Sequence, residues 1–332
     1  MPTEPVNVLV TTPIEQEYLD QIAAISPRVK VENVSSLAKA DQEGDYVPGS
    51  EFDAVLAEAD VIYGLRLPRN FARRTPRLKW VQVMSAGVDR FLDAGLRKSP
   101  AILTNVSGIH ATPIGEFVLE QMLMFAKGAA LCFEMQRKRQ WRRFGPTVLR
   151  GKTVGIIGLG EIGREVARLS KAFGMRVIAT RRSTKRETRA RNVDVMLPSA
   201  GLHRALAESD FVVITLPYTK ETDAVIGEAE FEAMKPTAYI INIGRGRIID
   251  EAAMIRALSE NRIAGAGLDV FATEPLPRSS KLWGMPNVLF SPHVSGGMED
   301  YNAKATDLFC RNLERFLAGK RLFNVVGKRR GY

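Results

Sequence analysis

The chain has 332 residues, of which 45% are hydrophobic and 25% charged, a composition ordinary for a soluble globular protein with room for two domains. Lys and Arg total 47 against 37 Asp and Glu, so the formal net charge of +10 favours anionic ligands but indicates no particular fold. Cys132 and Cys310 provide neither a disulfide framework nor metal-ligand spacing, and no signal peptide or uninterrupted apolar span is found, so we expect a cytoplasmic protein without a metal site or membrane segment.

The first third of the chain predicts one α/β unit. Runs rich in Val and Ile predict strands at 6–10, 29–34, 60–65, 78–84 and 101–106, with helices at 14–25 and 51–58 between them. Strands that alternate with helices indicate a parallel sheet flanked by helices. One long helix at 112–130 would bridge this unit to the next.

A second α/β unit begins at "GKTVGIIGLG" (151–160). Its predicted strands lie at 153–157, 175–180, 210–216, 238–243, 265–270 and 287–291, and its predicted helices at 161–173, 228–235 and 250–261. The final segment, 301–320, has apolar residues at helical spacing and is followed by no strand, so we expect it to pack on the first unit. The predicted architecture is two α/β units with a cleft between them, the first discontinuous in sequence.

A glycine loop opens the second unit. Gly158, Gly160 and Gly163 have G-x-G-x-x-G spacing, follow a buried type of strand and open a helix with one apolar face. In that context the spacing indicates a dinucleotide fingerprint, because the loop can turn tightly and the helix N-terminus offers N–H donors to a pyrophosphate. Leu159, Glu161 and Ile162 complete the loop.

The most basic stretch, "VIATRRSTKRETRAR" (177–191), places Arg181 where an NAD-binding unit usually has Asp or Glu. A guanidinium cannot accept hydrogen bonds from a ribose diol but suits a 2′-phosphate, so Arg181, with Arg182 and Ser183, predicts NADP as the preferred cofactor. The alternative is that Arg181 stacks on the adenine and NAD binds as well. We interpret 185–191 as a solvated helix or loop face and expect no nucleic-acid binding, because aromatic residues do not interleave with these charges.

Three segments past predicted strand ends carry reactive side chains: Arg245 in "INIGRGRIID", Glu274 in "GLDVFATEPLP" and His293 in "VLFSPHVSGG". The arginine can hold a substrate carboxylate and polarise the adjacent carbonyl, and the imidazole can deliver a proton. Glu274, if bonded to the other ring nitrogen, would orient the imidazole and favour its protonated form. We interpret His110 and His203 as structural.

Several motifs in the same order are similar to those of the D-isomer-specific 2-hydroxyacid dehydrogenase family, over nearly the whole chain. They are "MSAGVDRF" (84–91), "GIIGLGEIGREVA" (155–167), "ITLPYTKET" (214–222), "MKPTAYIINIGRGRIIDEAAMIRAL" (234–258), "AGAGLDVFATEPLP" (264–277) and "PNVLFSPHVSG" (286–296). The chain departs from the usual family pattern at Arg181, in the manner of the family's NADP-preferring reductases.

The resemblance implies two parallel-sheet α/β domains with an active-site cleft between them. The substrate-binding, flavodoxin-like domain would comprise 1–106 plus 294–332, and the dinucleotide-binding Rossmann domain 107–293. Arg245, Glu274 and His293 would be catalytic, and Ser85, Ala86 and Gly87 would bind the substrate carboxylate together with Arg245. Further residues expected to line the cofactor are Thr215, Leu216, Pro217, Thr222, Ile243, Gly244, Asp269, His293 and Gly296.

The leading functional hypothesis is NADPH-dependent reduction of a small 2-oxoacid, of glyoxylate or hydroxypyruvate type, to the (R)-2-hydroxy acid. Alternatives are a dinucleotide-sensing corepressor of the same fold, or an NAD-dependent dehydrogenase for another 2-hydroxy acid or for phosphite or formate. The resemblance also implies a homodimer through the long helix from Pro113. Arg66 could add a cation for the carboxylate or be a surface charge, and Trp141 could reach a neighbouring subunit's site or serve packing.

Overall fold

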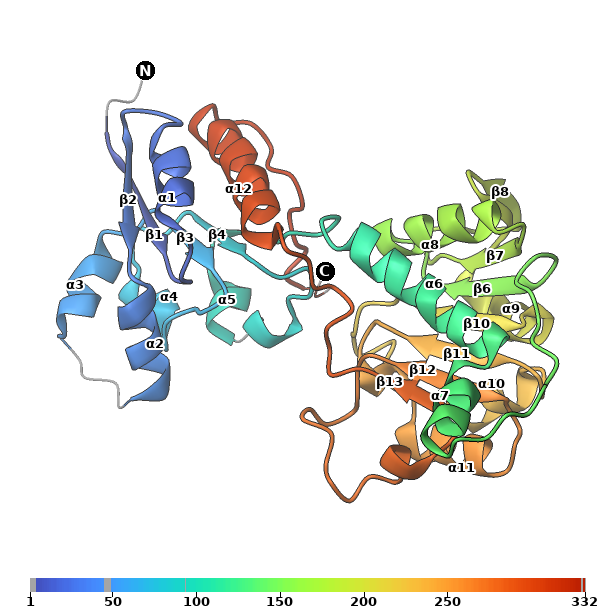
Figure 1. The fold of residues 1–332 in the computed structure, drawn as a ribbon. Helices are drawn as coiled ribbons and strands as arrows, with labels where there is room; N and C mark the ends of the chain where they lie inside the picture. The colour runs from blue at the N-terminus through green and yellow to red at the C-terminus, as the bar shows by residue number, and fades with distance from the viewer. Residues whose placement is uncertain (1–3, 45–48, 93, 330, 332) are drawn as a thin grey trace. The chain divides into compact units, whose positions relative to one another are not determined.

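The computed structural model describes residues 4–44, 49–92, 94–329 and 331 (Figure 1). The chain divides into two compact units, unit 1 from Met1–Ile109 with Met298–Tyr332 and unit 2 from His110–Gly297. Each unit is built on its own sheet of mainly parallel strands, which confirms the predicted α/β fold class. None of the described helices combines the length and the apolar character that crossing a bilayer requires.

Unit 1 contains a five-stranded parallel sheet in the order β2-β1-β3-β4-β5 within its described residues. Its strands are β1 (Val6–Val10), β2 (Val29–Asn33), β3 (Val61–Gly64), β4 (Trp80–Val83) and β5 (Ile102–Thr104). Its helices are α1 (Gln16–Ala23), α2 (Ser35–Glu43), α3 (Glu51–Ala57), α4 (Phe71–Arg74), the 3-10 turn η1 (Asp89–Phe91), α5 (Ala94–Lys98) and α12 (Tyr301–Leu317). This strand order is that of flavodoxin-like sheets.

Alternate residues of the unit 1 strands face two helical layers. Val8 packs in a cluster with residues of α1 and α12, whereas its neighbour Leu9 packs against α2 and α3. On the first face the Phe309 ring of α12 stacks on Tyr63 and Trp80, with ring centroids 4.2 and 4.9 Å apart. The final helix therefore belongs to unit 1, as its apolar spacing predicts.

A buried polar network also fastens α12 to the sheet. Trp80 Nε1 donates to Thr104 Oγ1 at 2.8 Å, and the Thr104 hydroxyl donates to Gln82 Oε1 at 3.1 Å. Asn312 Nδ2 of α12 donates to the same Gln82 oxygen at 2.9 Å. Beyond the helix, Val326 N donates to the Leu103 carbonyl at 2.8 Å, so the segment after α12 covers the edge strand β5.

Unit 2 contains an eight-stranded sheet in the order β13-β12-β11-β10-β6-β7-β9-β8 within its described residues. Its strands are β6 (Thr153–Ile157), β7 (Arg176–Thr180), β8 (Thr188–Ala190), β9 (Val193–Leu197), β10 (Phe211–Ile214), β11 (Tyr239–Asn242), β12 (Gly265–Leu268) and β13 (Val288–Phe290). Its helices are α6 (Ala111–Lys127), α7 (Ala129–Arg137), α8 (Glu161–Ala172), η2 (Ser199–Gly201), α9 (Leu202–Glu208), α10 (Glu228–Ala233), η3 (Gly246–Ile248), α11 (Glu251–Ser259) and η4 (Lys281–Gly284). The parallel strands have the doubly wound Rossmann order.

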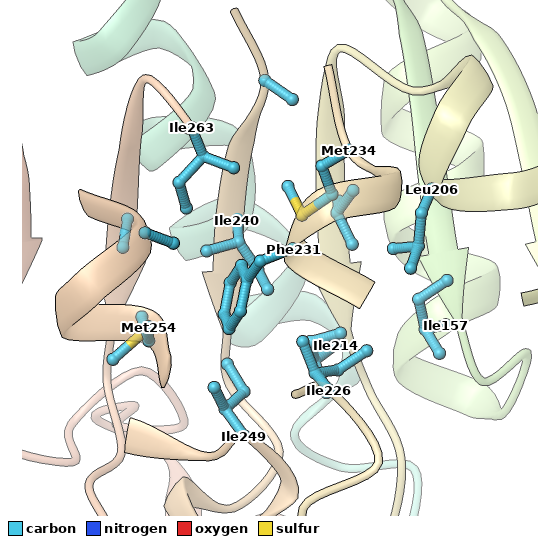
Figure 2. Packing of buried hydrophobic residues seen from close by; sticks show 14 of the residues in the cluster. Ile157, Leu206, Ile214, Ile226, Phe231, Met234, Ile240, Ile249, Met254 and Ile263 are labelled. Carbon is cyan, nitrogen blue, oxygen red and sulfur yellow. The ribbon is translucent and has the colours of Figure 1, made fainter. Parts of the chain in front are cut away.

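Both faces of this sheet are covered by helices. Ile214 and Ile240 belong to the cluster that packs against α9, α10 and α11, with Phe231 of α10 at its centre (Figure 2). The neighbouring residues Val213 and Ile241 pack on the opposite face against α6 and α8. This burial on both faces explains why the strands are continuous apolar runs rather than alternating ones.

Two predictions about unit 2 are wrong. The helix expected at 112–130 ends at Lys127, because Gly128 takes a left-handed φ of 64° and α7 starts anew at Ala129. The segment 185–191 is not a helix or loop face throughout: Thr188–Ala190 forms β8, which pairs antiparallel with β9. The strand β9 itself, Val193–Leu197, is absent from the sequence prediction.

Candidate active site

The glycine loop connects β6 to α8. Gly158 has a φ of 106°, which L side chains rarely adopt. A Cβ on Gly163 would lie 2.5 Å from the Gly158 carbonyl oxygen, whereas one on Gly160 would meet no described atom within 4 Å. Leu159 is buried, and Glu161 and Ile162 begin α8. The loop therefore has an open surface over a helix N-terminus, which fits a pyrophosphate.

The basic turn follows the neighbouring strand. β6 and β7 pair in register from Thr153 and Arg176 to Ile157 and Thr180, and Leu159 N donates to the Thr180 carbonyl at 3.0 Å. Arg181 comes next and starts a turn that closes with a 3.1 Å hydrogen bond from Thr184 N to its carbonyl. Arg181, Arg182 and Ser183 are all exposed. The turn and the glycine loop thus occupy the same edge of the sheet.

A third loop joins this edge from β10. The Thr215 hydroxyl donates to the Gly158 carbonyl, and Thr215 N donates to the Ile157 carbonyl at 3.0 Å. Thr222 Oγ1 accepts from Thr219 N and donates to the Pro217 carbonyl, both at 2.8 Å. Thr215 therefore braces the glycine loop, and Thr222 shapes the turn that carries half-buried Leu216 and exposed Pro217.

An acidic residue lies close to the basic turn. A hydrogen bond from the Thr219 hydroxyl, assisted by the positive charges of Arg182 and Lys220, lowers the pKa of Glu221.

Arg245 lies in a tight turn after β11. Asn242 folds this turn, because its Nδ2 donates to the Arg245 carbonyl at 3.0 Å and its Oδ1 accepts from Gly244 N at 3.1 Å. The half-buried guanidinium donates to the Gly244 carbonyl at 2.8 Å. A Cβ on Gly246 would come within 1.8 Å of the Phe271 carbonyl carbon, so only glycine lets the two backbones approach.

The Phe271 backbone belongs to the turn that carries Glu274. Glu274 Oε1 accepts from Phe271 N at 3.0 Å, and its other oxygen, Oε2, lies 2.7 Å from His293 Nδ1. His293 and Glu274 retain side-chain exposures of 48% and 36%, so the imidazole is accessible from solvent in unit 2. The carboxylate thus connects the turn after β12 to the imidazole after β13.

Asp269 anchors the segment around His293. Its carboxylate is fully buried and accepts hydrogen bonds from Ser291 Oγ at 2.6 Å, Val294 N at 2.8 Å and Ser295 Oγ at 2.5 Å. His293 itself has a φ of 56°, a left-handed conformation that non-glycine residues rarely adopt. The bonds on either side of His293 hold this strained backbone in place.

The remaining predicted residues divide between the units. Ile243 is buried at 6% exposure directly before Gly244. The Gly296 carbonyl oxygen lies 3.0 Å from His110 Nδ1. Burial of the His110 imidazole lowers its pKa. Ser85, Ala86 and Gly87 belong to unit 1, where the Ala86 carbonyl accepts from Asn105 Nδ2 at 2.7 Å.

Unit 2 therefore brings together, at one edge of its sheet, the turns that carry Arg245, Glu274 and His293. They follow β11, β12 and β13, which are adjacent parallel strands. Asn242 and Gly246 are not predicted as site residues, although an Asn at a strand end before G-R-G is their signal in the sequence. Ser291 and Ser295 are recognisable only through their contacts with Asp269.

Comparison with known proteins identifies relatives over most of the chain. Residues 119–295 match the family model described as D-isomer specific 2-hydroxyacid dehydrogenase, NAD binding domain. A glyoxylate reductase of Aeropyrum pernix is 35% identical, covering 82% of this chain and 84% of the relative. A glyoxylate/hydroxypyruvate reductase B of Pectobacterium carotovorum is 36% identical, covering 86% and 90%.

A solved structure agrees over both units. The NADPH-dependent glyoxylate/hydroxypyruvate reductase of Sinorhizobium meliloti, in complex with NADP and sulfate, superposes with a TM-score of 0.82 at 29% identity, covering 98% of this chain and 100% of that one. The family model spans the glycine loop and the turns of Arg245, Glu274 and His293, so the matched region is a nicotinamide-dinucleotide-binding domain. The chain therefore belongs to the D-isomer specific 2-hydroxyacid dehydrogenase family of oxidoreductases.

Proposed function

We propose that this protein reduces a small 2-oxoacid, of glyoxylate or hydroxypyruvate type, to the (R)-2-hydroxy acid with NADPH. The observation that carries the proposal is the 2.7 Å contact between Glu274 and His293, on the sheet edge that also holds the Arg245 turn. The names of the relatives support the substrate class, since those from Aeropyrum pernix and Pectobacterium carotovorum are glyoxylate or hydroxypyruvate reductases.

In the proposed mechanism, His293 supplies the proton. Its Nδ1 is engaged by Glu274, which orients the ring and leaves Nε2 to protonate the carbonyl oxygen as it becomes an alcohol. Arg245 binds the substrate carboxylate and polarises the adjacent carbonyl, and the backbone of Ser85, Ala86 and Gly87 assists in holding the carboxylate. When bound, the reduced nicotinamide supplies the hydride.

The cofactor preference for NADP follows from the basic turn. We expect Arg181→Asp to lower kcat/KM for NADPH by about 10- to 100-fold, because the 2′-phosphate loses a charge-assisted hydrogen bond. The value for NADH should change little, since its ribose diol makes no use of a guanidinium. Steady-state assays with glyoxylate and hydroxypyruvate measure both, and Arg191→Asp, an exposed charge of the same stretch, is the control. Equal losses with both cofactors, or a wild-type preference for NADH, would contradict the assignment.

The segment after Gly128 supports a homodimer as the working form. Phe133 and Trp141 are 55% and 95% exposed, and Phe144 and Val148 are 36% and 59% exposed. These four apolar side chains, set among basic residues, are candidates for burial in an interface. We expect sedimentation equilibrium to give a dimer for the wild type and a monomer for the double variant Phe133→Ser, Trp141→Ser. Val325→Ser, also at an exposed apolar residue, should remain dimeric. A monomeric wild type would remove this part of the proposal.

A further inference from the structure

A cavity of about 330 Å³ lies beside the carboxyl edge of the unit 1 sheet. Its walls come from the segment after β3 and from η1, with Leu65, Phe71 and Phe91 as apolar lining. β3 is the strand next to β1 at which the sheet order departs from chain order. Flavodoxin-like sheets bind their ligands outside the strand ends at this switch point.

The charged side chains that line the cavity are both arginines, Arg69 and Arg90. Arg90 lies with its guanidinium carbon 4.6 Å from the centroid of the Phe91 ring, and it forms no ion pair with any described carboxylate. Arg69 Nη2 donates to the Gln42 carbonyl at 2.5 Å, and Gln42 Nε2 donates to the Leu67 carbonyl at 3.1 Å. These bonds brace the wall of the cavity and leave further guanidinium N–H groups to serve a ligand.

The carboxylates behind this wall compensate only part of the charge of the two cations. Asp41 accepts from Arg74 Nη1 at 2.7 Å and from the Arg69 backbone N–H at 2.7 Å, and Asp53 accepts from Arg74 Nε at 2.5 Å. Arg74 pairs with both acids in a cluster of low exposure, so this cluster keeps one net negative charge against the two positive charges of Arg69 and Arg90. Among the described residues that line the cavity, none is acidic. The cavity is accordingly a site for an anionic group with a short apolar connection.

We propose that this cavity holds the far end of the substrate and that this end carries a negative charge, with Arg90, assisted by Arg69, as its partner. The inference rests on the proposed function, in which Ser85 to Gly87, just before η1, bind the 2-oxo carboxylate. Glyoxylate has no carbon beyond its carbonyl carbon, and hydroxypyruvate has only a hydroxymethyl group. A 2-oxoacid with a terminal carboxylate or phosphate would use the space and the charge that these small acids leave idle.

The test compares acids that differ only at the far end. With NADPH, kcat/KM is measured for 2-oxoglutarate against 2-oxovalerate, and for 3-phosphohydroxypyruvate against hydroxypyruvate, in the wild type, Arg90→Gln and Arg90→Lys. We expect at least one terminal anion to be preferred over its neutral counterpart by about 10- to 100-fold, the value of a charge-assisted hydrogen bond. The pair that shows the preference identifies the terminus as carboxylate or phosphate.

The variants separate binding by Arg90 from a general effect of charge. Arg90→Gln should abolish the preference for the terminal anion and leave glyoxylate turnover unchanged. Arg90→Lys should restore part of that preference. Arg73 is an exposed arginine of α4 outside the cavity, so Arg73→Gln should preserve the preference. Preference for the neutral acids, or equal losses for glyoxylate and the terminal anions in Arg90→Gln, would overturn the inference.

A failure of the proposed function gives a different result. In that case no 2-oxoacid, glyoxylate included, is turned over. Calorimetry then measures whether 2-oxoglutarate and 3-phosphohydroxypyruvate bind to the wild type and to Arg90→Gln, which tests the cavity as an anion site directly. Binding of either anion that is lost in the variant supports the cavity as an anion site, and the absence of binding by both, or equal binding to both proteins, refutes it.

Discussion

Replacing His293 with Asn lowers kcat by about 10²- to 10⁴-fold, the range expected when a positioned proton donor is lost. Asparagine is the replacement of choice because His293 has a φ of 56°, and Asn tolerates this left-handed conformation better than most residues. The backbone held by Asp269 should therefore persist, and the loss can be assigned to the imidazole. Steady-state kinetics with glyoxylate and NADPH measure the effect, and fluorescence titration with NADPH separates it from any change in binding of the cofactor, which His293 is also expected to contact.

The matched control is His203→Asn. His203 lies 2.8 Å from Glu230, an exposed contact between α9 and α10, and neither residue belongs to the turns after β11, β12 and β13, so kcat should stay at the wild-type value. Glu274→Gln should fall between the two, because the ring keeps a hydrogen-bond partner but loses the charge. If His293→Asn retains most of its kcat, the proton comes from elsewhere and the proposed mechanism is wrong.

Gly246→Ala should cost both stability and activity. The added Cβ would lie 1.8 Å from the Phe271 carbonyl carbon and 2.0 Å from its oxygen, and no side-chain rotation can relieve a clash with backbone. The Arg245 turn must then move away from the turn that carries Glu274. Because misplacement of reacting groups by about 1 Å can cost about 10²-fold, we expect kcat/KM to fall by at least about that factor.

The measurement pairs kinetics with thermal unfolding. Gly284→Ala is the control, since a Cβ there would meet no described atom within 4 Å and should leave Tm and kcat/KM near wild type. A lowered Tm and a lowered kcat/KM in Gly246→Ala alone would support the close approach. Wild-type kinetics in this variant would show that the two turns need not touch.

The sequence predicts those parts of the fold in which local pattern and long-range packing agree. β6 and its glycine loop are recognisable because an apolar run, three spaced glycines and an amphipathic helix follow one another within one unit. Some strands are shorter than predicted. A strand is predicted at 210–216, whereas β10 spans Phe211–Ile214, because the apolar run extends beyond the residues that pair with neighbouring strands. Apolar runs report burial, and strands are defined by hydrogen bonds.

The missed elements have physical reasons. The second residue of β9 is Asp194, which breaks the apolar run, yet its carboxylate accepts from Val177 N at 2.8 Å and from Lys171 Nζ at 3.0 Å. The strand is thus stabilised by partners that are distant in sequence. The break at Gly128 is invisible because a single glycine inside an apolar helical pattern is often tolerated.

At the candidate site, the sequence predicts which reactive types lie past the strand ends but not how they are held. Arg245, Glu274 and His293 stand out by chemistry and position. No local pattern encodes the contacts between loops that hold them. These contacts are the hydrogen bonds of Asn242, the close backbone approach at Gly246 and the hydrogen bonds accepted by the buried Asp269 carboxylate. Their catalytic roles stay predictions until the variants are assayed.

The buried hydrogen bonds and ring contacts of α12 affect the order in which the two units can fold during synthesis. Phe309 and Asn312 complete a core whose other half, around Trp80 and Gln82, is translated more than two hundred residues earlier. The nascent amino-terminal portion must therefore wait on the ribosome with an apolar sheet face uncovered, while His110–Gly297 emerges as one continuous stretch and can collapse first. We therefore expect the continuous middle of the polypeptide to complete its fold before the first unit does.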